Sequence, residues 1–165
     1  MDWLIWLESL PLSVWVRESG SLWSYPTVLF LHTVGLAFAV GMSAVISLRV
    51  LGAATEMPLP ALEPFYRVLW IGFWVNAASG VALLIADATT KLTNPVFFVK
   101  MICVGLAMGS MVAIRRRLGA AASGTSPGAN SITLLAWFSL AAWSGAILAG
   151  RLMAYIGPVS GVDPS

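Results

Sequence analysis

The sequence is poor in the residues on which many catalytic and metal sites depend. Its 165 residues include one histidine, His32, and one cysteine, Cys103. A single cysteine excludes a disulfide within the chain. One histidine and one cysteine are also too few to supply the ligands of a typical zinc site. The chain also lacks a recognisable nucleophile triad, phosphate-binding loop, CxxC or HExxH pattern. An electron carrier or an accessory subunit is therefore a better expectation than an enzyme.

Charged residues are also scarce. They make up 10% of the chain, against about 25% in an average soluble domain. Hydrophobic residues make up 59%, and the mean hydropathy is +0.88. The few lysines and arginines stand near the ends of apolar runs, so the net charge of +2 indicates membrane topology and not nucleic-acid binding. The composition predicts an integral membrane protein that contacts the lipid bilayer along most of its length.

The apolar runs predict an all-α fold, an integral membrane bundle of four transmembrane helices within residues 21–165. Each run approaches or exceeds the roughly 20 residues that cross a bilayer as a helix. Residues 1–20 are predicted to form an interfacial amphipathic helix, because apolar residues such as Trp3 and Trp6 occur there together with Asp2 and Glu8. Pro11 interrupts this run. The predicted spans are about 22–48, 68–88, 96–114 and 131–156.

The arginines predict how the chain is oriented. Arg49, Arg67 and the run Arg115 to Arg117 lie in or beside the loops that follow the first and third spans. Cytoplasmic loops carry an excess of lysine and arginine, so these two loops are expected in the cytoplasm. Both termini would then be periplasmic if the protein lies in the inner membrane of a bacterium.

The first span contains the residue of greatest interest. His32 is the only ionisable side chain between Tyr25 and Arg49, and Gly35 and Ala39 follow it at helical spacing. Small residues mark the face of a membrane helix that packs against other helices, and an intramembrane ionisable residue is often functional. Two interpretations follow: a neutral imidazole bonded to a neighbouring helix, or an axial metal ligand that holds haem b.

Three charged residues are expected at the same membrane face as His32. Asp87, Lys100 and Arg151 lie near the outer ends of spans two, three and four. One interpretation is an ion network of Asp87 with Lys100 and Arg151, because unpaired charges in membrane helices are expensive. The other is a cofactor-binding site in which Lys100 and Arg151 hold the haem carboxylates and Asp87 balances the charge.

One histidine cannot provide both axial ligands of a bis-histidine haem. The iron would be five-coordinate, or take a methionine, or take His32 of a second subunit in a homo-oligomer. An electron carrier of this kind also implies a redox partner. The methionines placed deeply enough in the predicted spans are Met101, Met108 and Met153.

Two sets of residues carry a resemblance to known families. Leu31 to Gly35, with Gly41, and the stretches Trp74 to Gly80 and Asn94 to Lys100 resemble bacterial four-helix integral membrane proteins of unknown function. Around His32 the chain is also similar to CopD-like copper-resistance proteins and b-type membrane cytochromes, which implies haem or copper there. The other histidines of those two families are absent.

The sequence also contains a short internal repeat. Val34 to Ala37 of the first span reads Val-Gly-Leu-Ala, and the same four residues return as Val104 to Ala107 in the third. Two parallel helical hairpins would give this pattern.

The favoured interpretation is a small membrane haem-binding electron-transfer protein with an outward-facing intramembrane site. The alternatives are a non-catalytic membrane subunit or scaffold, and a small transporter that uses Asp87 and His32 as a proton relay.

Overall fold

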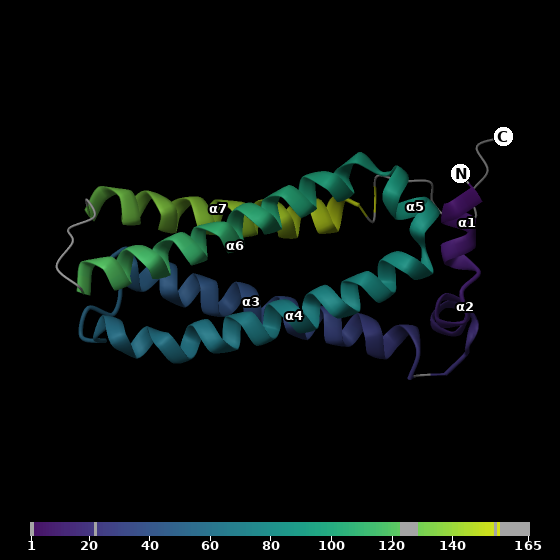
Figure 1. The fold of residues 1–165 in the computed structure, drawn as a ribbon, viewed down its shortest axis with the longest axis horizontal. Coiled ribbons are helices and arrows are strands. Elements are labelled where there is room, and N and C mark those ends of the chain that lie inside the picture. Colours follow the sequence, from purple (N-terminus) through teal and green to yellow (C-terminus); the bar gives the residue numbers. More distant parts are fainter. Residues whose placement is uncertain (1, 22, 123–128, 154, 156–165) are drawn as a thin grey trace.

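Four long helices form the molecule (Figure 1). The structure is a computed structural model that describes residues 2–21, 23–122, 129–153 and 155. Within these residues there is no strand, and four helices are long and apolar enough to cross a membrane. The predicted all-α four-helix bundle is confirmed, and the chain is a multi-pass membrane protein. The long helices are α3 (Tyr25–Val50), α4 (Glu63–Ala86), α6 (Pro95–Ala122) and α7 (Ala129–Leu152).

The helices pack as two hairpins. Helix α3 packs along α4, α6 packs along α7, and α3 also contacts α7 (Figure 1). We call the end where α3 begins and α4 ends the short-helix end, since three short helices lie there. We call the opposite end, which carries Arg49, Arg67 and Arg115, the arginine end. The short helices are α1 (Asp2–Glu8), α2 (Pro11–Glu18) and α5 (Ala88–Thr93).

The N-terminal segment consists of two helices and not the single helix that was expected. The break falls at Ser9 and Leu10, and Pro11 occupies the first turn of α2, where its missing N–H is not needed. Glu8 of α1 accepts hydrogen bonds from the backbone N (2.7 Å) and Oγ1 (2.6 Å) of Thr89, at the start of α5. These bonds hold α1 against α5, and α2 packs against α4. The position of α1 and α2 at a lipid surface stays a prediction.

Several predicted span ends are displaced. The third helix does not stop at Arg115 but continues to Ala122, because arginine is a good helix former and its long side chain reaches water from a helix end. Helix α4 ends at Ala86, and α5 occupies most of the segment between the predicted spans 68–88 and 96–114. Helix α7 ends at Leu152, while positions 154 and 156 of the predicted span lie outside the described residues.

Helices α3 and α4 approach each other closely enough to exclude a side chain. A Cβ added to Gly35 would lie 2.5 Å from the backbone N of Asn76 and 2.8 Å from the carbonyl O of Gly72. A Cβ added to Gly72 would lie 2.7 Å from Cβ of Phe38. Such contacts let two membrane helices pack backbone to backbone. At Gly105 and Gly109 of α6, by contrast, an added Cβ meets no atom within 4 Å.

A buried polar network joins α3 to α7. The indole Nε1 of Trp143 donates to Oγ of Ser43 at 2.8 Å, and Oγ of Ser139 lies 3.2 Å from the same hydroxyl. Ser47, one turn after Ser43, is also fully buried, but its hydroxyl has no hydrogen-bond partner within the described part of the chain. The two serines therefore form a matched pair for mutagenesis.

We expect Ser43→Ala to lower the free energy of unfolding by about 1–3 kcal/mol, because the buried Trp143 N–H loses its acceptor. Ser47→Ala should leave that free energy unchanged or raise it, since it removes a buried hydroxyl without a partner. Denaturant unfolding in detergent measures both variants. Equal losses would show that the Trp143–Ser43 bond contributes no stability of its own.

Candidate functional site

His32 lies two turns into α3, at the short-helix end, and faces α4. Its Nδ1 lies 2.9 Å from the carbonyl O of Asn76. In return the side-chain Nδ2 of Asn76 donates to the carbonyl O of His32 at 2.7 Å. The two residues thus hold each other across the helix pair, next to the close contact of Gly35 with Asn76. This orientation agrees with the expectation that His32 faces a neighbouring helix.

The contacts of Nδ1 indicate which ring nitrogen carries the proton. A carbonyl oxygen can only accept, so the 2.9 Å contact with Asn76 places the proton on Nδ1. Two donors also lie near Nδ1, Nδ2 of Asn76 at 3.3 Å and Oγ of Ser79 at 3.4 Å, but each makes a shorter bond elsewhere. Nδ2 donates to the carbonyl O of His32 at 2.7 Å, and Oγ of Ser79 donates to the carbonyl O of Val75 at 2.6 Å. The lone pair then resides on Nε2, for which the described residues provide no hydrogen-bond partner. An imidazole fixed by Nδ1–H to a backbone carbonyl, with Nε2 free, is the arrangement common in metal-ligating histidines.

Gly80 makes room for the imidazole ring. A Cβ added there would lie 3.0 Å from Cε1 and 3.3 Å from Nδ1 of His32. The sequence shows Asn76 and Gly80 four residues apart, on one face of a helix. That spacing alone does not reveal that this face meets His32, so the partners of the histidine had to come from the structure.

The predicted pairing of Asp87 with Lys100 or Arg151 is wrong. Asp87 forms its ion pair with Lys91, at 3.0 Å, and no other ion pair of Asp87 occurs within the described ranges. The reason is local: Asp87 stands at the break between α4 and α5, and Lys91 follows it by one helical turn. Asp87 therefore does not take part in a network that links the ends of the long helices.

Lys100 and Arg151 have different surroundings. Lys100 is half-buried, and its side chain runs along α7, where a Cβ added to Gly150 would lie 3.8 Å from its Cε. Arg151 is exposed, on the same outward face of α7 as Leu148. Neither cation forms an ion pair with another described residue.

The three candidate methionines occupy distinct environments. Met108 is 6% exposed and belongs to the buried core cluster, so its thioether is engaged in packing. Met101 is 49% exposed on the surface of α6. Met153 is half-buried, just after α7 ends.

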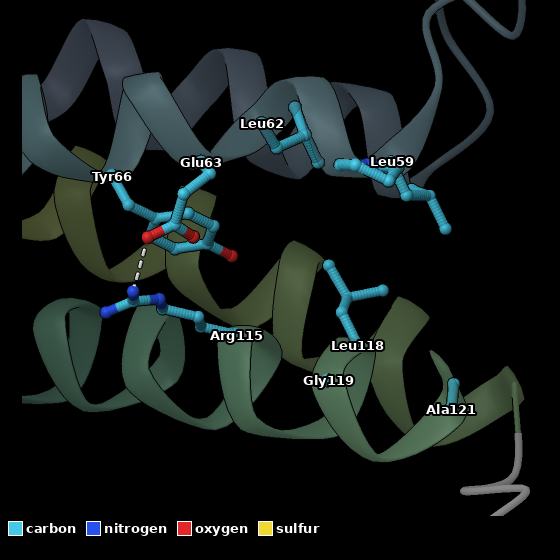
Figure 2. A pocket seen from close by; sticks show the side chains of 9 residues that line it. Leu59, Leu62, Glu63, Tyr66, Arg115, Leu118, Gly119 and Ala121 are labelled. Atoms are coloured by element: carbon cyan, nitrogen blue, oxygen red, sulfur yellow. Dashed lines mark hydrogen bonds and ion pairs between the residues drawn. The ribbon is translucent and has the colours of Figure 1, made fainter. Parts of the chain in front are cut away.

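A second feature, which the sequence did not predict, lies at the arginine end. A pocket of about 650 Å³ opens between α4, α6 and the 3₁₀ helix η1 (Leu59–Leu62) (Figure 2). An ion pair between Arg115 and Glu63 stands at its side, and the guanidinium of Arg115 lies 5.6 Å from the ring centroid of Tyr66. The only sequence signal for this region was the cluster of arginines.

Comparisons with protein-family models, with curated proteins and with solved structures gave no match. The fold therefore defines the class, a multi-pass membrane protein built as a four-helix bundle. The resemblances to CopD-like proteins and to b-type cytochromes stay predictions.

Proposed function

We propose that this chain is a small membrane haem protein that carries electrons, with haem b bound at Nε2 of His32. The observation that supports the proposal is the hydrogen bond from Nδ1–H to the carbonyl O of Asn76, which fixes the ring and leaves the Nε2 lone pair without a partner in the described part of the chain. Lys100, and at the surface Arg151, are cations without an ion-pair partner in the described chain, suited to the carboxylates of the cofactor. Bound haem b would supply one-electron redox chemistry.

Expression with ample haem tests this proposal. The purified full-length protein should retain a Soret band that shifts on reduction with dithionite, and the haem-to-protein ratio should be stoichiometric. One haem per chain indicates a five-coordinate iron or a methionine ligand, whereas one haem per two chains indicates His32 of a second copy. A colourless protein after such expression contradicts the proposal.

The proposal includes an orientation: the short-helix end faces the periplasm of a bacterium. Five arginines at the arginine end support it: Arg49, Arg67, Arg115, Arg116 and Arg117.

Reporter fusions check this orientation. An alkaline phosphatase fused after Ser165 should be active, since that enzyme needs the periplasm, and one fused after Glu56 in the α3–α4 loop should be inactive. A fluorescent protein at the same two positions should give the opposite pattern. If the phosphatase is active only in the fusion after Glu56, the topology is the opposite of the proposed one, and the His32 site lies on the cytoplasmic side.

One observation favours a second candidate, a non-catalytic membrane subunit or scaffold. The reciprocal hydrogen bonds between His32 and Asn76 by themselves stabilise the α3–α4 pair. On this interpretation His32 has only a structural role, and the protein acts by holding a partner in the membrane.

A further inference from the structure

The pocket at the arginine end is remote from the proposed haem site and has its own polar and apolar walls. Besides the 650 Å³ pocket, a smaller one of about 320 Å³ shares Glu63, Tyr66 and Arg115 with it. The smaller pocket adds Arg67, Trp70 and Ile71, which lie further along α4 toward the bundle centre. The two hollows therefore flank the Glu63–Arg115 ion pair and form one groove along α4, which we call the arginine groove.

A buried hydroxyl in the arginine groove has no partner. Tyr66 is 3% exposed, and its hydroxyl makes no hydrogen bond to any described residue. Figure 2 shows the ring extending from α4 so that the hydroxyl points between Leu62 and Leu118, into the pocket. Buried polar groups are nearly always bonded, so an unsatisfied one at a pocket wall points to an absent ligand atom.

The charge around the arginine groove is positive. Arg115 and Arg67 line it, and Arg116 and Arg117 follow on α6. The side chain of Arg115 is 51% exposed even though it pairs with Glu63, so its guanidinium is accessible to a second anion. Within residues 44–70 and 111–136, which cover this end, the only acidic residues are Glu56 and Glu63.

The depth of the arginine groove places it at the membrane interface. The candidate span Leu59–Ala86 has 28 residues and Pro95–Ala121 has 27. Helices of this length extend about 40 Å, which is longer than the roughly 30 Å hydrocarbon core, so their ends reach the head-group layer. Ile71 is 64% exposed, which places an apolar surface directly below the arginines.

We propose that the arginine groove binds an anionic phospholipid. Arg115 and Arg67 would bind the phosphate, since guanidinium groups pair with phosphate through parallel hydrogen bonds. The Tyr66 hydroxyl would donate to a phosphate or glycerol oxygen, and one acyl chain would lie along Trp70 and Ile71. Basic pockets between membrane helices recognise anionic lipid head groups by the same chemistry.

Lipid titration of the delipidated full-length protein in detergent tests the proposal, with native mass spectrometry as the readout. Dioleoylphosphatidylglycerol should bind at least about tenfold more tightly than dioleoylphosphatidylcholine, because only the former carries a net negative charge. Arg115→Gln should remove this preference. Arg116→Gln is the matched control, because Arg116 is exposed on the same helix and lines neither pocket.

Tyr66→Phe tests the groove without changing its charge. The variant should bind phosphatidylglycerol several-fold more weakly, because one hydrogen bond to the lipid is lost. Its unfolding midpoint without lipid should not fall, since the hydroxyl has no hydrogen-bond partner among the residues that the structure describes.

Three results would overturn the proposal. The first is equal affinity for the two lipids, and the second is an equal loss in Arg115→Gln and Arg116→Gln. The third is displacement of the lipid by glycerol 3-phosphate at a similar concentration, which would identify a soluble phosphate ester as the ligand.

Discussion

Gly35→Ala should prevent α3 and α4 from packing in their native register. The new Cβ would lie 2.5 Å from the backbone N of Asn76 and 2.8 Å from the carbonyl O of Gly72, and neither backbone atom can move without shifting the whole helix. Overpacking typically costs about 1–3 kcal/mol, and a backbone clash belongs at the upper end of that range or beyond it. The same displacement would also separate His32 from its bonding partner, Asn76.

Two glycines serve as controls for this result. Gly41 lies on the same helix, and Gly105 occupies the equivalent place in the internal repeat; an added Cβ meets no atom within 4 Å at either position. Gly→Ala at both should leave the free energy of unfolding unchanged or raise it by up to about 1 kcal/mol, because alanine is the better helix former. Thermal unfolding and gel filtration in detergent distinguish the outcomes. Equal stability of the Gly35 and Gly41 variants would show that the helices do not meet at Gly35.

The second large effect is expected at His32. Its replacement by glutamine keeps a side-chain donor for the carbonyl O of Asn76, so the fold should lose only about 1 kcal/mol if the ring has a structural role alone. If Nε2 binds iron, His32→Gln removes the ligand, and the Soret band should disappear while gel filtration and circular dichroism show an intact bundle.

Variants of the two cations provide graded controls. Lys100→Gln should weaken haem retention without abolishing it, since it removes carboxylate pairing but not the iron bond. Arg151→Gln should have a smaller effect, because Arg151 is exposed on the outward face of α7. Asp87→Asn should leave haem retention unchanged, as its carboxylate pairs with Lys91. If the His32→Gln variant retains haem as well as the native chain does, His32 has only a structural role.

Parts of this protein could be predicted without a structure because they depend on local composition. Whether a segment crosses a bilayer follows from the length of its apolar run, so the four long helices and the place of His32 within the first of them were predictable from the sequence. The ends of the helices were less predictable. Arginines remain compatible with a helix that emerges from the membrane, and α6 accordingly continues past Arg115 to Ala122.

The tertiary structure decided which residues meet. Gly35 and Gly105 stand in the same four-residue motif, yet only Gly35 lies at a helix contact, because the approach of another helix is not encoded in the motif. Asp87 pairs with Lys91 because helix α4 ends just before Asp87 and helix α5 begins just after it. A hydropathy pattern does not show this helix boundary.

The surroundings of His32 and Tyr66 also separate what the sequence predicts from what only the tertiary structure shows. The sequence established that His32 lies within a membrane span and that arginines gather at the opposite end of the bundle. It could not establish that the carbonyl O of Asn76 accepts a hydrogen bond from Nδ1–H of His32, or that Tyr66 points into a pocket beside Arg115. Both depend on the rotation of each helix about its axis and on its crossing with its neighbours, which are set by packing over the whole bundle.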